Sequence, residues 1–146
     1  MPSDAIDAEA ERLTGMALGG NGETLKELRQ SLKEIMWRRA GVIRDDPGLN
    51  QGLEEIADLK ERFNDISVIG GRQLQRAVKL GNMLTSAEMV CRSALYRRES
   101  RGAHYRQDHL GRNDREWLCN VLLTNKGDHM TVNTEPIEWT RLKPQT

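Results

Sequence analysis

The stretch RQLQRAVKLGNMLTSAEMVCRSAL, residues 72–95, decides the fold. Its apolar and small side chains recur every three or four residues, at Leu74, Val78, Gly81, Leu84, Ala87, Cys91 and Ala94. This spacing places them on one face of an α-helix, which we expect from Arg72 to Arg101 with Gly102 directly after its end. Such a stripe needs partner helices to cover it, so the sequence before it must supply them.

Two shorter segments upstream carry seams of the same kind. The first, Glu23–Arg44, has its seam at Leu25, Leu28, Leu32, Ile35 and Val42, and the second, Pro47–Ile66, at Leu49, Leu53, Ile56, Phe63 and Ile66. We expect Asp46 to cap the second segment, with Pro47 in its first turn. Because the loops between the segments are short, the three helices should form an antiparallel bundle.

The predicted helices differ in length, which has a consequence at one end of the bundle. At 1.5 Å per residue the helix from Arg72 spans ~45 Å and its predecessor ~30 Å. We therefore expect the longest helix to overhang its neighbour near Arg92–Arg101, where the exposed helix end would offer a contact surface.

The two ends of the chain lack the long helical seams of the bundle and carry other sequence patterns. Residues 3–18 indicate a short helix capped by Ser3, and the glycines of residues 19–22 then break the chain. Residues 117–123 read as a strand, 125–128 as a turn and 130–133 as a returning strand, with Pro136 ending the pairing. The expected fold is mainly α: an N-terminal helix and linker (1–21), a three-helix bundle (22–102), and an Arg/His-rich loop with a small β extension (103–146).

Composition narrows the class of protein without naming a function. Hydrophobic residues make up 37% and charged residues 30% of the 146 positions, and no apolar run approaches the ~20 residues that span a bilayer. The start has no basic and apolar signal pattern. Cys91 and Cys119 lie far apart, which is typical of reduced cytosolic thiols. Residues 1–66 carry 9 Lys and Arg against 14 Asp and Glu, and residues 67–146 carry 13 against 8, so an anionic partner for the basic half is one interpretation.

Arginines concentrate at the expected overhang, in a segment without lysine. They are Arg92, Arg97, Arg98, Arg101, Arg106, Arg112 and Arg115. Four interpretations are open: local pairing with acids and helix-end carbonyls, a docking surface, nucleic-acid binding, or an active site using His104 and His109. Nucleic-acid binding lacks a recognition motif, and the histidine spacing matches no metal site. His129 falls in a turn, where we expect it to be solvated.

Several stretches resemble a known family. Residues 99–108, ESRGAHYRQD, resemble the ESRGAHxRxD segment of succinate dehydrogenase and fumarate reductase flavoproteins, and Val132–Pro136 resembles their VNMEP stretch. Gly41–Arg44 is similar to the turn that ends a family helix. The chain departs from the family at Leu110, Asn113 and Asn120. L-aspartate oxidase shares part of the SRG motif and stays a second candidate, beside a free-standing helical module for an anionic partner.

The resemblance implies a C-terminal, spectrin-like three-helix domain that holds neither FAD nor substrate and is inactive alone. It would pack on the FAD-binding domain of the same subunit, beside an iron–sulfur subunit, in a cytoplasmic complex peripheral to the inner face of the cell membrane. We expect no nucleic acid and no direct membrane contact, and a homodimer is open for an isolated fragment. No catalytic, cofactor or metal residue is assigned. The hypothesis for interdomain docking uses Glu99, Ser100, Arg101, Gly102, His104, Arg106, Asp108 and Arg112.

Overall fold

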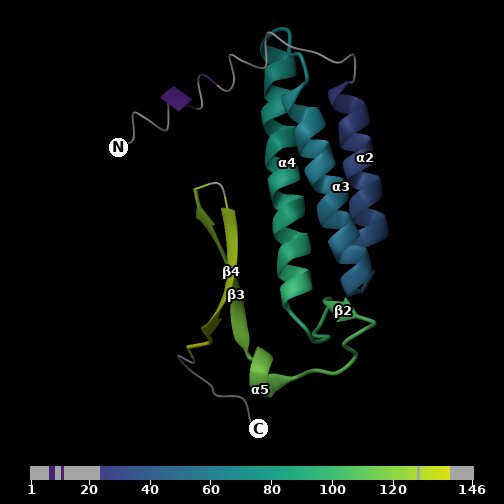
Figure 1. Ribbon diagram of the computed structural model, residues 1–146, viewed down its shortest axis with the longest axis vertical. Coiled ribbons are helices and arrows are strands. Elements are labelled where there is room, and N and C mark those ends of the chain that lie inside the picture. The colour runs from purple at the N-terminus through teal and green to yellow at the C-terminus, as the bar shows by residue number, and fades with distance from the viewer. Residues whose placement is uncertain (1–6, 9–10, 12–23, 128, 139–146) are drawn as a thin grey trace.

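A computed structural model describes residues 7–8, 11, 24–127 and 129–138 (Figure 1). Three long helices lie side by side in an antiparallel bundle: α2 (Leu25–Ala40), α3 (Asp46–Asn64) and α4 (Gly71–Tyr96). The expected bundle is thereby confirmed. The N-terminal helix predicted for residues 3–18 falls almost wholly outside the described residues.

Helix α2 is shorter than the sequence suggested. It begins after Thr24, whose hydroxyl accepts the N–H of Glu27 at 3.2 Å while the Glu27 carboxylate accepts the N–H of Thr24 at 2.9 Å. This reciprocal capping box satisfies two N–H groups that the helix cannot. The helix ends at Ala40, so its predicted extension to Arg44 is wrong. Strand β1 (Ile43–Arg44) pairs instead in parallel with β2 (Tyr105–Arg106), which satisfies the backbone outside the helix.

Helix α3 is capped one residue earlier than predicted. The Asp45 carboxylate accepts the N–H of Gly48 at 2.8 Å, and Asp46 is the first helical residue rather than the cap. Gly52 allows α3 to approach α2 closely, because a Cβ there would lie 3.0 Å from the Cβ of Arg39. The helix ends at Asn64, just short of the predicted Ile66.

Helix α4 ends at Tyr96, and both its predicted end at Arg101 and the predicted overhang are wrong. Arg97 is extended (φ −80°, ψ 107°), so the chain leaves the helix axis there. The following residues fold back across the ends of α4 and α3 and cover them. Gly102 does not follow the helix. It has φ 57° and lies in the tight turn in which Arg101 and His104 exchange backbone hydrogen bonds.

The core is aliphatic and lies between the three helices. Its fully buried members include Leu28, Leu49, Leu59, Ala77 and Cys91, each with no exposed surface. Phe63 is the one aromatic ring among the described buried residues. The seam positions predicted from the sequence are buried or partly buried except for Val42, which lies beyond the true end of α2 with 73% of its surface exposed.

The C-terminal part forms the predicted hairpin. Strands β3 (Cys119–Lys126) and β4 (His129–Pro136) pair in antiparallel register from Cys119–Pro136 to Lys126–His129, and Gly127 has φ 65° in the turn between them. Trp117 is not in the strand as expected but ends the short helix α5 (Asp114–Trp117), where its ring meets Tyr96 edge-on at 5.8 Å. The hairpin runs beside α4 (Figure 1). None of the described helices combines the length and apolarity that crossing a bilayer requires.

Candidate functional site

Arg106 is the centre of the arginine-rich segment and has no exposed surface. Its Nη1 lies 2.6 Å from the carbonyl oxygen of Ala94 and 3.3 Å from those of Leu95 and Arg97. Its Nε and Nη2 donate to the two carboxylate oxygens of Asp108 at 2.8 and 2.7 Å, and Nη2 also donates to Asp46. One guanidinium thus connects the end of α4, the start of α3 and the loop that follows α4.

The charges of this connection match the dipoles of the two helices. The last carbonyl groups of α4 carry partial negative charge and have no partner within the helix, and Arg106 donates to them. The first N–H groups of α3 carry partial positive charge, and Asp108 accepts the N–H of Asp46 at 2.8 Å. Hydrogen bonds from Arg106 hold the pKa of Asp108 well below its usual range. Burial alone would lower the pKa of Arg106, but Asp108 and Asp46 outweigh that effect and raise it.

Glu99 is a second centre and is likewise fully buried. Its carboxylate accepts hydrogen bonds from Arg97 at 2.5 Å, from Nε of Arg101 at 2.7 Å and from the backbone N–H of Asn113 at 2.8 Å. Burial opposes its ionisation, but these donors outweigh burial and hold the pKa of Glu99 below its usual value. Arg97 also donates to the carbonyls of Trp117 and Cys119 at 2.9 and 2.6 Å, which attaches the hairpin to the end of α4.

His104 is held between two arginines with both ring nitrogens engaged. Nη1 of Arg44 lies 3.3 Å from Nδ1, and because a guanidinium can only donate, Nδ1 must be the acceptor. Nε2 then carries the proton and donates to the carbonyl of Arg97 at 3.1 Å. Burial lowers the pKa of His104, the hydrogen bond to the Arg97 carbonyl partly opposes this, and the charges of Arg44, Arg106 and Arg97 lower it further, so the neutral ring predominates at pH 7. A ring with both nitrogens occupied is a positioning group rather than an acid, a base or a ligand.

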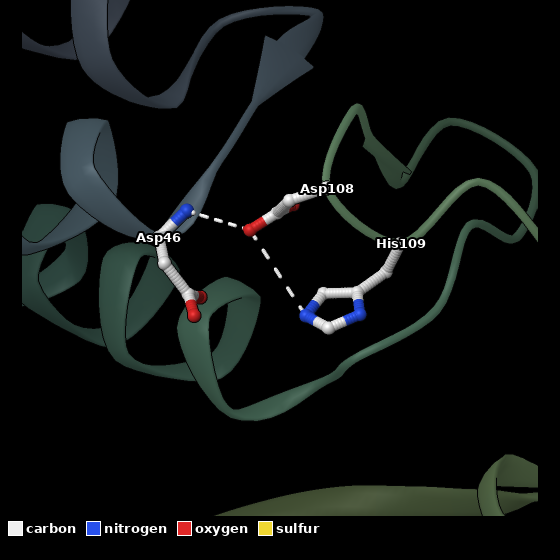
Figure 2. A group of neighbouring side chains, drawn as sticks. All are labelled: Asp46, Asp108 and His109. Carbon is white, nitrogen blue, oxygen red and sulfur yellow. Dashed lines mark hydrogen bonds and ion pairs between the residues drawn. The ribbon is translucent and has the colours of Figure 1, made fainter.

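Asp46, Asp108 and His109 are the described residues whose spacing could suit a metal ion (Figure 2). Nε2 of His109 lies 4.0 Å from Oδ2 of Asp108, and that same oxygen accepts the Asp46 N–H. The Arg106 guanidinium contacts both carboxylates and already supplies the positive charge that they need. A divalent ion here would face that guanidinium, so the group is better explained as an arginine–carboxylate bridge.

The remaining residues of the docking hypothesis lie in the same network. Ser100 accepts the Arg106 N–H at 2.9 Å and donates to the His109 carbonyl at 2.8 Å, while Arg101 and Arg112 both bind Asp114. Local pairing, one of the four interpretations of the sequence, therefore describes five of the seven arginines. Within the described part of the chain, the side chains of the other two, Arg98 and Arg115, are exposed and have no hydrogen bond or ion pair.

Sequence reasoning missed two partners in the network. Arg44 and Asp46 were not placed in the site, although Arg44 closes a stretch that resembles a family turn. Asp46 was expected to cap a helix, but its carboxylate reaches a guanidinium sixty residues along the chain. No local pattern predicts such a contact. The thiols of the two cysteines are both free and form no bond with the arginines of the network, and burial raises the pKa of the Cys91 thiol to about 11.

One family model matches most of the chain. Residues 29–146 match the family described as the fumarate reductase flavoprotein C-terminal region. The chain is 33% identical to a fumarate reductase flavoprotein subunit of Mycobacterium tuberculosis over 98% of this chain, and 38% identical to an FAD-dependent oxidoreductase of Methanocaldococcus jannaschii over 68%. A solved quinol fumarate reductase of E. coli superposes with a TM-score of 0.86 over 98% of this chain at 26% identity.

The chain spans only 18–27% of the length of these three proteins. The matches do not favour the L-aspartate oxidase alternative.

Proposed function

Because this chain belongs to the family of C-terminal domains of fumarate reductase and succinate dehydrogenase flavoproteins, we propose that it is the helical C-terminal domain of such a subunit. In this proposal it packs on the flavin-binding domain of the same polypeptide and supports assembly with an iron–sulfur subunit. It does not catalyse the reaction alone. The match over residues 29–146 carries the proposal.

The internal network supports a structural rather than a catalytic role for this domain. The side chains of Arg106, Glu99 and His104 form their hydrogen bonds within the chain, to helix ends, charged side chains and backbone groups. Side chains bonded in this way fix the conformation of the segment that carries them. We propose that the network fixes residues 97–115, so that their exposed side chains, Arg98, Arg112 and Arg115 among them, meet the flavin-binding domain in one geometry.

The proposed activity belongs to the whole subunit. FAD bound to the preceding domain would exchange a hydride with succinate or fumarate, and electrons would pass to the iron–sulfur subunit. This chain would hold neither FAD nor substrate, and the complex would lie at the inner face of the cell membrane through other subunits. The names of the relatives support the reaction class, while the direction of the reaction depends on the redox partners.

The length and the FAD content of the native polypeptide test the proposal. Purified from its source, the polypeptide should be several times longer than 146 residues and contain FAD. Arg101→Ala in that protein should lower flavin retention and association with the iron–sulfur subunit, because Arg101 braces both Glu99 and Asp114. A native polypeptide of 146 residues would instead support the free-standing module. Unchanged retention and assembly in Arg101→Ala would remove the docking loop from the proposal.

A further inference from the structure

The three grooves between the helices of the bundle differ sharply in chemistry. The α2–α3 groove is bridged by ion pairs from Arg38 and Arg39 to Glu55, at 2.9 and 2.8 Å. The α3–α4 groove is bridged by an ion pair between Lys60 and Glu88. Between α2 and α4, the described residues form no ion pair. Two of the grooves thus have the charged cover expected of a solvated face, and the third does not.

The α2–α4 groove is hollow, apolar and continuous. A hollow of about 580 Å³ at one end includes Leu25, Ile66 and Met83 in its lining, and a second, of about 380 Å³, shares Lys79 and Met83 with it. A third hollow, of about 420 Å³, shares Val90 with the second and runs between α4 and the hairpin, against Val121 and Leu123.

The side chains along this groove repeat at helical spacing. On α4 they are Lys79, Met83, Ser86, Val90 and Ser93, with Arg97 just after the helix end, and on α2 they are Leu25, Arg29, Leu32 and Met36. Ser86 donates its hydroxyl hydrogen to the carbonyl of Asn82 at 2.8 Å, so its polarity is satisfied within its own helix. Met89 and Val90 remain 38% and 44% exposed. The groove thus continues from core-packed side chains such as Leu32 and Met83 to the more exposed Met89 and Val90, which is typical of a surface that another element covers.

We propose that the α2–α4 groove, continued between α4 and β3, is the surface on which the flavin-binding part of the same polypeptide packs. The inference rests on the proposed function and names the surface that this function uses. The groove then receives the apolar part of this partner, while the arginine-rich loop at its end holds α4 and the hairpin in place and adds its exposed arginines to the same interface.

Two observations select this occupant. Thr24 and Leu25 line the hollow at one end of the groove, so the polypeptide that precedes them is tethered at its mouth, which raises the effective concentration of anything upstream. The same end has a basic rim of Lys26, Arg29, Arg76 and Lys79, and none of the four forms an ion pair with a described residue. The matching surface should therefore be an apolar ridge flanked by carboxylates.

Photo-crosslinking in the full-length flavoprotein tests the proposal. A benzoylphenylalanine at Val90 lies in the groove, and one at Glu54 lies in the α2–α3 groove as the control. The crosslinker at position 90 should react with peptides of the flavin-binding part, and its yield should be several times higher than the yield of the crosslinker at position 54. Reaction of Val90 with a second copy, with a separate subunit or with residues 1–23 of this chain would overturn the assignment, as would equal yields at the two positions.

A pair of substitutions gives a second measurement. Val90→Glu places a charge in the groove, while Leu122→Glu places one at a position that is 41% exposed and, by strand alternation, faces away from Val121 and Leu123. Val90→Glu should lower flavin retention several-fold, and Leu122→Glu should leave it near that of the parent. Equal effects would overturn the assignment. A full-length protein with FAD but no Val90 crosslink would refute the groove alone, whereas a native chain without a flavin domain would refute the proposed function.

Discussion

Arg106→Ala is the most informative single change in this chain. The substitution removes a fully buried guanidinium that donates to three carbonyls at the end of α4 and to the carboxylates of Asp108 and Asp46. The carbonyls of Ala94 and Leu95 and the two carboxylates remain, while the Arg97 carbonyl keeps His104 and Asp108 keeps the Asp46 N–H. The change therefore measures the cost of removing the charge that joins the end of α4 to the two carboxylates.

The magnitude follows from burial. Breaking a buried ion pair from one side costs roughly 3–5 kcal/mol, because the remaining charge stays desolvated. Asp46 and Asp108 are 43% and 28% exposed and can regain water, which favours the lower end, about 3 kcal/mol. With a urea dependence of ~1–3 kcal/mol per molar for a chain of this size, the unfolding midpoint should fall by about 1–3 M.

Urea unfolding followed by far-ultraviolet circular dichroism measures this shift. Arg38→Ala is the matched control, since it also removes an arginine–carboxylate pair, but its side chain is 58% exposed and Glu55 keeps a bond to Arg39. The control should change stability by less than about 1 kcal/mol. If Arg106→Ala costs no more than Arg38→Ala, the idea that Arg106 holds the two helix ends together is refuted.

Three further predictions concern protonation. Asp108→Asn should flatten the acid limb of the stability profile: the folded pKa of Asp108 is depressed, so the parent keeps this contribution above about pH 4 and loses it at lower pH. Parallel profiles would contradict this. His104→Gln should remove a loss of stability that begins below about pH 6.5, since the folded pKa of His104 is also depressed and protons favour the unfolded chain; urea midpoints between about pH 7 and 5 measure it, and an undiminished loss argues against it. Iodoacetamide should label Cys119 and spare buried Cys91, whose pKa is about 11, until urea is added, and mass spectrometry of native protein labelled at both would disprove this.

Local signals predicted most of the bundle but not where its helices end. The seams gave the three helices and their order, because periodicity reports burial along one element. The end of α4 at Tyr96 was missed because residues 97–101 have acceptable helical propensity, and the competing hydrogen bonds come from Arg106, which is distant in sequence. The cap at Asp45 was missed for a simpler reason: two adjacent aspartates both suit the position, and only the backbone geometry separates them.

The candidate site shows the same division between local and distant information. The arginine-rich segment was recognisable as unusual, and its pairing with local acids was among the interpretations considered. The sequence could not rank pairing above docking, because an arginine bound to Asp46 and one free to bind a partner look alike along the chain. Burial separates them: Arg106 and Glu99 have no exposed surface, whereas Arg98 is exposed.

The buried pairs also explain why a domain with few aromatic residues can present a defined surface. Aromatic residues make up 4% of the chain, and among the described residues one ring pair, Trp117 against Tyr96, joins the start of the hairpin to the end of α4. Bidentate arginine contacts supply the rest of the attachment, since each fixes direction as well as distance. Arg97 orders β3 through the carbonyls of Trp117 and Cys119, and the placement of β3 puts Val121 and Leu123 beside Val90. Loss of the Arg97 hydrogen bonds to these carbonyls should therefore open the proposed groove at its hairpin end, although Arg97 contributes little of the apolar surface that a partner would bury there.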